Sequence, residues 1–338
     1  MTKAEYKALN LLLDTPKKIV IVPHHNPDGD AIGSSLGLFH YLKKRNHQVS
    51  VVAPNDYPAF LKWLPGTPEV LVYESQAETC ADVLAEASLL FALDFNALHR
   101  TGVMQSALEQ AEATFVLIDH HPQPEAFAQF TYSDVGMSST CEMIYHFITH
   151  LGGLSLLDEA TATCLYTGIM TDTGSFKYPS TTSLTHRVVA HLLDCGANHS
   201  AIHEAVYDAN RTSRLQLLGC ALKNLTVLPE YRTAYLSLSQ EELKAHDFKK
   251  GDTEGFVNYG LSIKDVVFAA IFIENAQEDV IKISLRSKGS FSVNAFSRAH
   301  FDGGGHTNAA GGKSDLSLPD TIEKFISILP TYKNALNK

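Results

Sequence analysis

The sequence predicts an α/β protein of two domains, an N-terminal parallel sheet flanked by helices and a smaller C-terminal α/β domain. Four short β-branched or apolar segments lie at 18–23, 48–53, 88–94 and 114–119, and three helical patterns lie between them at 31–45, 76–86 and 101–112. Parallel strands need long crossover connections, so this alternation indicates a parallel sheet wrapped by helices. A change to a strand-rich pattern after residue 225 indicates the second domain.

The predicted domain boundaries follow these changes of pattern. From 139 to 223 the sequence is almost entirely helical, and beyond it strands are expected in RTAYLSLS, VVFAAIFIE and DVIKISLRS. A helical SVNAFSRA and a glycine-rich loop, FDGGGHTNAAGG, come next. We therefore expect a first domain at 1–190, a helical connector at 191–224 and a second domain at 225–338.

Composition limits the classes of protein that fit. The 338 residues are 45% hydrophobic, enough for two cores. No segment approaches the roughly 20 uncharged apolar residues of a membrane helix, and the amphipathic N-terminus lacks a small-residue cleavage site, so we expect a cytoplasmic protein without membrane contact. Five cysteines without CxxC spacing do not suggest a disulfide framework.

The formal charge of −10 argues against binding of long duplex nucleic acid, which needs a basic face. Short anionic substrates remain compatible with an acidic surface, because a pair of cations and a few arginines can bind one or two phosphates. The sequence leaves the oligomeric state open, a homodimer included.

Side chains that can bind metal gather at the ends of predicted elements. The carboxyl ends of parallel strands meet at one edge of a sheet, so segments distant in sequence can converge there. Oxygen donors with a minority of imidazoles suit Mn²⁺ or Mg²⁺ better than structural zinc. The ligand candidates are His24, Asp28, Asp30, Asp94, His120 and Asp172, with Asp119 and His121 beside them.

Each of these residues also has a purely structural interpretation. Asp28-Gly29-Asp30 is a good turn sequence, and Asp30 can cap a helix that starts at Ala31. Asp94 alone is typical of a strand-end cap, and Asp172 alone of a helix end. Six ligand-type residues at element ends in one domain favour a metal site over these separate explanations.

The combination resembles the DHH phosphoesterase family. The resemblance rests on HxNPDGDAIGS at 24–34, Asp94, DHHP at 119–122, TDTGSF at 171–176 and GGGH at 303–306. Within the family the chain is similar to the two-domain branch of nanoRNases and 3′-phosphoadenosine 5′-phosphate (pAp) phosphatases. The resemblance implies a two-metal hydrolase with a DHH-associated C-terminal domain that binds substrate, and an active site in the cleft between the domains.

The resemblance also implies a role for each residue of the first domain. His24 and Asp28 would bind one Mn²⁺, with Mg²⁺ as the alternative metal, and Asp30, His120 and Asp172 would bind the other. Asp94 would bridge the two ions, which together activate a shared water. Asp119 would orient the adjacent imidazoles, and His121 would face the substrate, either to stabilise the phosphate oxygens or to protonate the leaving group.

In the second domain, backbone N–H groups of a glycine run can approach a phosphate closely. The resemblance implies substrate binding by Gly303, Gly304, Gly305 and His306, and Arg286 and Arg298 are candidates for bidentate phosphate contacts. A flexible turn and solvated surface charges are the alternatives. Ser138, Ser139 and Thr140 are interpreted as helix caps, with a phosphate at that helix start as the alternative.

The leading hypothesis is hydrolysis of short oligoribonucleotides to mononucleotides, with pAp dephosphorylation as a related activity, so that short RNA and nucleotide bisphosphates are the expected partners. Rival enzymatic hypotheses are a linear or cyclic dinucleotide phosphodiesterase and an exopolyphosphatase or pyrophosphatase. A nucleotide sensor without catalysis is a hypothesis of another class, which the complete set of ligand candidates disfavours.

Overall fold

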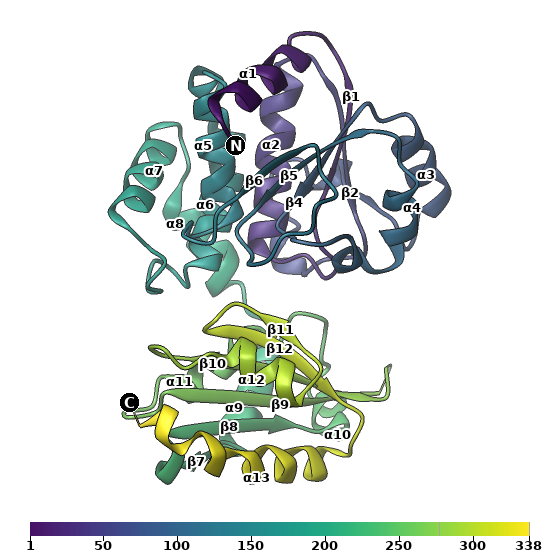
Figure 1. The fold of residues 1–338 in the computed structure, drawn as a ribbon. Helices are drawn as coiled ribbons and strands as arrows, with labels where there is room; N and C mark the ends of the chain where they lie inside the picture. The colour runs from purple at the N-terminus through teal and green to yellow at the C-terminus, as the bar shows by residue number, and fades with distance from the viewer. Residues whose placement is uncertain (277, 338) are drawn as a thin grey trace. The chain divides into compact units, whose positions relative to one another are not determined.

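The computed structural model describes residues 1–276 and 278–337 and divides the chain into two compact units, Met1–Ala209 and Asn210–Lys338 (Figure 1). The division lies inside the predicted connector at 191–224. Helix α8 (His199–His203) belongs to the first unit and helix α9 (Thr212–Lys223) to the second. No helix in the described part of the chain is both long and apolar enough to cross a membrane.

A six-stranded sheet forms the centre of the first unit, with strand order β3-β2-β1-β4-β5-β6. Every neighbouring pair is parallel, which confirms the predicted parallel sheet. Strands β3 and β6 were not expected from the sequence, because they are short edge strands of two and four residues. The strands are β1 (Lys18–Val22), β2 (Gln48–Ala53), β3 (Leu71–Val72), β4 (Leu89–Leu93), β5 (Thr114–Asp119) and β6 (Phe130–Ser133).

Helices cover both faces of this sheet (Figure 1). Strand β1 shows the reason, because Ile19 and Ile21 pack into one core and the alternate residues Val20 and Val22 into another. The first core includes residues of α1, α2, α5, α6 and α7, and the second includes residues of α3 and α4. The helices are α1 (Lys3–Leu12), α2 (Gly29–Lys44), α3 (Ala77–Ala85), α4 (Gln105–Glu109), α5 (Thr140–His150), α6 (Glu159–Asp172) and α7 (Ser183–Asp194).

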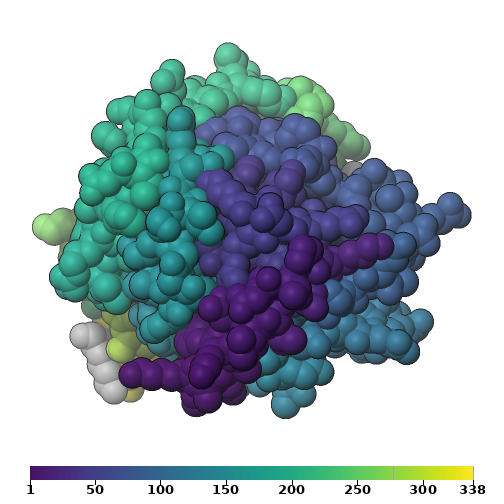
Figure 2. Space-filling model, turned by 90° about the horizontal axis from the view of Figure 1, so that it is seen from above, coloured from purple at the N-terminus to yellow at the C-terminus, as the bar shows by residue number. Residues whose placement is uncertain are grey.

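Two helical segments of this unit differ from or add to the sequence pattern. The helix expected at 101–112 is a 3-10 segment, η3 (Leu98–Met104), followed by α4, because Gly102 has a non-helical φ of 58°. The N-terminal α1, purple in Figure 2, lies at the surface beside α5. Its Tyr6 stacks on His150 with ring centroids 4.5 Å apart.

The other short helical segments of the unit are η1 (Ala59–Leu61), η2 (Thr67–Glu69), η4 (Leu154–Leu156) and the π-helical η5 (Glu204–Asp208).

The second unit has a mixed six-stranded sheet of order β11-β12-β10-β9-β8-β7, in which β8 and β9 are parallel and the other pairs antiparallel. Phe268, Phe296 and Phe325 are fully buried at the centre of one of its cores. The strands are β7 (Thr226–Leu228), β8 (Thr233–Leu238), β9 (Phe268–Asn275), β10 (Val280–Ser287), β11 (Gly304–Gly305) and β12 (Ala309–Ser314). The remaining helical segments are η6 (Pro229–Tyr231), α10 (Gln240–Ala245), α11 (Phe256–Leu261), α12 (Val293–His300) and α13 (Leu318–Leu336).

The glycine-rich segment predicted as a loop at 301–312 is largely a hairpin of β11 and β12. Ala309 pairs with Arg286, and Gly311 pairs with Ser284 of β10. Alanine and glycine have low β propensity, so this strand is stabilised by its backbone partners rather than by its side chains. The α/β class and the two-unit organisation predicted from the sequence are confirmed.

Candidate metal centre and active site

The carboxyl ends of β1, β4 and β5 are neighbours in the parallel sheet and carry most of the candidate residues of the first unit. His24 follows β1, Asp94 follows β4, and Asp119 ends β5. His24, Asp94 and Asp119 are all buried, as expected for side chains at a covered sheet edge. The edge contributed by three separate strands is therefore lined by titratable groups.

One group of ligand atoms is formed by His24, Asp28 and Asp94, which lie within 4.8 Å of one another. His24 Nδ1 donates to the carbonyl of His25 at 2.9 Å. This bond directs Nε2 toward the carboxylates, 3.5 Å from Asp94 Oδ2 and 3.9 Å from Asp28 Oδ1. The imidazole is thus oriented by the backbone of the next residue.

Helix α2 explains why Asp28 and Asp30 are both at this edge. Asp28 is the N-cap, and its Oδ1 accepts the backbone N–H groups of Asp30 and Ala31. The alternative that Asp30 caps a helix starting at Ala31 is therefore wrong. Asp30 lies in the first turn with 1% exposure, so its carboxylate is inside the protein.

A second group is formed by Asp30, His120 and Asp172. His120 Nε2 is 3.5 Å from Asp172 Oδ2 and 3.8 Å from Asp30 Oδ2. The other ring nitrogen, Nδ1, is 3.3 Å from the carbonyl of Met137, to which it donates. Asp172 is the last residue of α6, so the end of that helix delivers the third ligand atom.

Asp94 belongs to both groups through different oxygens. Its Oδ2 is near His24 Nε2, whereas its Oδ1 is 3.5 Å from His120 Nε2. One carboxylate therefore spans two clusters of donor atoms. This is the arrangement expected of a side chain that bridges two cations.

The donor set fits divalent cations in both spacing and charge. Ligand atoms roughly 2.1 Å from one octahedral ion lie about 3 Å apart at right angles and about 4 Å apart when opposite, and the separations of 3.5–3.9 Å around His24 and His120 fall in this range. Burial, together with Asp94 and Asp172, raises the pKa of Asp30 well above its usual value. Burial, with Asp28 and Asp94, also raises the pKa of Asp172 to about 7, although His120 opposes the change. Cations would remove this repulsion between carboxylates.

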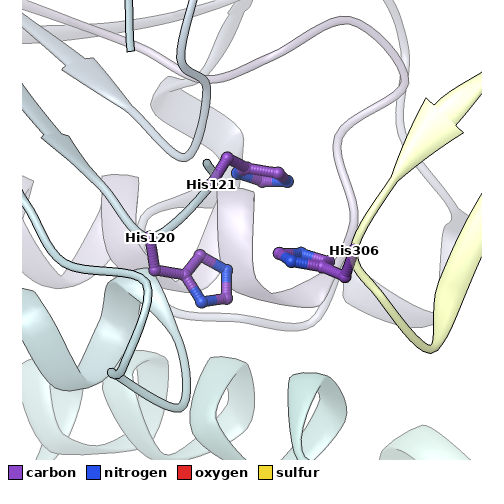
Figure 3. A group of neighbouring side chains, drawn as sticks. All are labelled: His120, His121 and His306. Atoms are coloured by element: carbon purple, nitrogen blue, oxygen red, sulfur yellow. The ribbon is translucent and has the colours of Figure 1, made fainter. Parts of the chain in front are cut away.

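Asp119 and His121 lie beside the two groups and form a third with Asp94, whose Oδ1 is 3.7 Å from His121 Nδ1. His121 Nδ1 donates to Asp119 Oδ1 at 2.7 Å. Asp119 is fully buried, and its Oδ2 has no hydrogen-bond partner among the described residues. Figure 3 shows the rings of His120 and His121 following β5, where their centroids are 5.2 Å apart in an edge-on arrangement.

Asn55 and the contact of Thr140 with this site were not identified from the sequence, whereas Asn26 belongs to the HxNPDGDAIGS motif. Asn26 and Asn55 bond reciprocally, with Asn55 Oδ1 accepting the N–H of Asn26 at 2.7 Å and Asn55 Nδ2 donating to Asn26 Oδ1 at 2.9 Å. Thr140, interpreted as a cap, instead donates to Asp94 Oδ1. Ser139 is the N-cap of α5, which confirms that part of the interpretation. For Asn55, the signal in the sequence is that it is a polar residue shortly after the end of β2.

The candidate residues of the second unit lie on β10, α12 and the β11–β12 hairpin. Arg286 on β10 is half-buried and donates from Nη1 to its neighbour's carbonyl, Leu285 O. Arg298 on α12 is exposed and donates from Nε to Asn294 Oδ1 at 2.9 Å. His306, also drawn in Figure 3, is carried by the hairpin between Gly305 and Ala309.

The three glycines of the hairpin have different structural roles. A Cβ atom on Gly303 would collide with Gly311 O and Ser297 Oγ, and Gly305 has a φ of 142°. These two glycines are required by the hairpin itself. A Cβ atom on Gly304 would come no closer than 3.8 Å to Arg298 Nε, so Gly304 is the glycine that the fold does not demand.

Comparison with known proteins agrees with these motifs. Residues 18–169 match the DHH family, N-terminal domain, and residues 232–333 match the DHHA1 domain. The bifunctional oligoribonuclease and PAP phosphatase NrnA of Thermus thermophilus is 32% identical over 310 residues, which cover 91% of this chain and 88% of the relative. The chain belongs to the DHH family. This result confirms the resemblance found in the sequence, and the protein is a DHH phosphoesterase, a hydrolase.

Further relatives of this DHH-family chain match along almost their whole length. The probable bifunctional oligoribonuclease and PAP phosphatase NrnA of Streptococcus mutans is 30% identical over 297 residues, 88% of this chain and 89% of the relative. An exopolyphosphatase-related protein from Bacteroides fragilis, known from its crystal structure, is 40% identical with a TM-score of 0.96, covering 100% of this chain and 98% of that one. The similarity therefore extends over both units.

Proposed function

We propose that this protein is a manganese-dependent phosphoesterase that hydrolyses short oligoribonucleotides to mononucleotides and dephosphorylates pAp. The observation that carries the proposal is the pair of donor groups linked by the two oxygens of Asp94. The full-length relatives from Thermus thermophilus and Streptococcus mutans, named for these two activities, support the choice of substrate.

His24, Asp28 and Asp94 would hold one cation, and Asp30, His120, Asp172 and again Asp94 the other. The mixture of carboxylates and imidazoles favours Mn²⁺, and Mg²⁺ also suits the oxygen donors. Two cations of this kind supply charge neutralisation of the phosphoester and a water of lowered pKa. The Nδ1–H bonds of His24 and His120 to backbone carbonyls keep Nε2 of each ring directed at the donor group.

His121 is the residue we assign to the substrate phosphate. Its Nδ1–H is held by Asp119 Oδ1, so the orientation of the ring is fixed. When both ring nitrogens carry a proton, Nε2 would donate from that position to a phosphoryl oxygen or to the leaving oxygen. Asp119 acts through His121 and does not itself contact substrate.

Arg286 and Arg298, together with Gly303, Gly304, Gly305 and His306, would bind the far end of the substrate. Arg286 is the stronger candidate of the two arginines, because it is half-buried on a strand whose backbone pairs with Ala309 of the hairpin. Arg298 is exposed and already bonded to Asn294. The net charge of −10 favours substrates of a few nucleotides over long polymers.

The test is Mn²⁺-dependent hydrolysis of 5′-labelled RNA from two to about 30 nucleotides, beside pAp, a cyclic dinucleotide, polyphosphate and pyrophosphate. Faster release of mononucleotides from dimers to pentamers than from the longest RNA is expected, with phosphate release from pAp. Faster cutting of long RNA contradicts the chain-length proposal. If only a cyclic dinucleotide, polyphosphate or pyrophosphate is hydrolysed, that compound would replace short RNA and pAp as the proposed substrate.

A further inference from the structure

The N-terminus of α5 contacts two of the proposed metal ligands at once. The backbone N–H groups of Thr140 and Cys141 donate to Asp30 Oδ2 and Oδ1 at 2.6 and 2.8 Å. The Thr140 hydroxyl donates to Asp94 Oδ1 at 2.9 Å. Asp30, Asp94 and Thr140 are all at most 2% exposed, so no solvent competes for these bonds.

We propose that Thr140 is a positioning residue that orients the bridging carboxylate of Asp94 toward both cation sites while its backbone holds Asp30. The inference rests on the proposed function, because it takes Asp94 and Asp30 as metal ligands. Thr140 touches neither substrate nor reacting atoms and acts through the two carboxylates.

The direction of the hydroxyl bond carries this inference. Asp94 must present Oδ2 to the His24 group and Oδ1 to the His120 group, and rotation of the carboxylate would break both alignments. A donor on Oδ1 opposes that rotation and leaves one lone pair of the oxygen for a cation. Asp94 is also held at a left-handed φ of 64°, so its backbone is fixed as well.

The Thr140 hydroxyl does not serve as the N-cap of α5. The N-cap of α5 is Ser139, whose Oγ accepts the N–H of Glu142 at 3.1 Å. The helix start is fixed by a further buried contact, because Glu142 Oε2 accepts from the hydroxyls of Ser138 and Thr185, the latter on α7. Thr140 is therefore presented to Asp94 by a rigid helix end.

The experiment compares Thr140→Val, which removes the hydroxyl, with Thr140→Ser, which retains it. Titration calorimetry with Mn²⁺ on the full chain measures affinity, and electron paramagnetic resonance measures the magnetic coupling between two bound Mn²⁺ ions. Loss of an outer partner of a metal ligand weakens metal binding about 10–100-fold. We expect that loss, with reduced coupling, in Thr140→Val and near wild-type behaviour in Thr140→Ser. Thr140→Ala repeats the test if the valine variant does not fold.

Thr321→Val is the matched control for losing a buried hydroxyl. Thr321 is fully buried in the second unit and donates to Ser314 Oγ at 2.9 Å. The Thr321→Val variant should be less stable than the wild type but should bind Mn²⁺ with the same affinity. Wild-type Mn²⁺ affinity and coupling in Thr140→Val, or an equal loss in Thr140→Ser, would overturn the inference while the proposed function stands. Two Mn²⁺ ions bound by the wild type without hydrolysis would reject the function alone, and absence of Mn²⁺ binding by the wild type would reject both.

Discussion

Asp94 combines three features. It has a left-handed backbone, it is 2% exposed, and its two oxygens face different imidazoles. Strained backbone at a non-glycine residue costs about 1–3 kcal/mol and is retained where the surroundings enforce it. His24 and His120 lower the pKa of Asp94 well below its usual value, although burial alone would raise it. These features fit the bridging role that we propose for Asp94.

Replacing Asp94 by alanine should abolish turnover with little loss of fold. Both cation sites would lose a ligand, and because loss of an outer partner already costs about 10–100-fold in metal affinity or activity, loss of a shared ligand should cost at least about 100-fold. Activity and Mn²⁺ stoichiometry measure the effect, with far-UV circular dichroism as the check on folding. Asp82→Ala, an exposed aspartate on α3, is the matched control. Retained activity in Asp94→Ala would refute the bridging assignment.

At the scale of elements, the close approach of α2 and α6 brings Asp172 to Asp30. A Cβ atom on Gly33 of α2 would lie 2.6 Å from the carbonyl oxygen of Cys164 on α6. A Cβ atom on Gly168 of α6 would collide with Cys141 Sγ and lie 3.0 Å from Asp30 Oδ1. The glycines thus set the separation of the two helices, and through it the separation of two carboxylates.

Gly33→Ala, a substitution in the core, should therefore lower the affinity for Mn²⁺. Overpacking of this kind costs about 1–3 kcal/mol, and it should weaken Mn²⁺ binding because α6 moves away with Asp172. Urea unfolding and Mn²⁺ titration measure the two effects. Gly219→Ala on α9 is the control, since a Cβ atom there meets nothing within 4 Å, and it should stabilise by roughly 0.5–1 kcal/mol. Equal Mn²⁺ affinity in Gly33→Ala and wild type would contradict the argument.

Asp158, the N-cap of α6, should make the stability of the protein depend on pH in a way that does not involve the metal site. Burial would raise the pKa of Asp158, but bonds from Lys44 Nζ and from the N–H and hydroxyl of Thr161 outweigh it and lower the pKa to about 2. A lowered pKa stabilises the folded state above the unfolded value of 3.8, and this contribution is lost as pH falls toward 2.

Asp158→Ala should accordingly cost about 0.5–2 kcal/mol at pH 7. The difference in unfolding free energy between wild type and variant should shrink as pH falls from about 4 to about 2, because protonation weakens the carboxylate as an acceptor and removes its charge. Urea unfolding at a series of pH values measures it. A difference that stays constant down to the lowest pH would show that the charge of Asp158 does not stabilise the helix.

At the scale of the molecule, each unit has hydrophobic cores of its own, and all the proposed cation ligands belong to the first. A ligand that binds the folded state stabilises the unit that binds it. The single tryptophan, Trp63, is in the first unit, so its fluorescence reports unfolding there, whereas circular dichroism reports the helices of both units.

Mn²⁺ should therefore shift the urea midpoint seen by Trp63 fluorescence. At a concentration 100 times its dissociation constant a ligand stabilises by about 2.7 kcal/mol, which corresponds to roughly 1–2 M urea at typical slopes. Chelation should reverse the shift, and Asp94→Ala should not show it. A Trp63 midpoint that is the same with Mn²⁺ and with chelator would contradict the assignment of the cations to the first unit.

The α/β class, the parallel sheet and the gathering of acidic and imidazole side chains at its carboxyl edge could all be predicted from the sequence. These follow from strand and helix patterns within short segments and from a topological rule about where parallel strands end. Family motifs then specified which aspartates and histidines to expect. The sequence did not predict the edge strands β3 and β6, the β11–β12 hairpin or the boundary between residues 209 and 210. These features depend on pairing between backbones and on packing.

The contacts that hold the proposed ligands became visible in the folded chain alone. Thr140 is 46 residues from Asp94 and 110 from Asp30 in sequence, yet it bonds to both. The division of Asp94 between two donor groups, and the role of Gly33 in setting the distance from α2 to α6, likewise depend on how elements pack. Local pattern carries the identity of a residue and its element, whereas the direction of a hydroxyl or carboxylate is fixed by neighbours that the chain supplies from elsewhere.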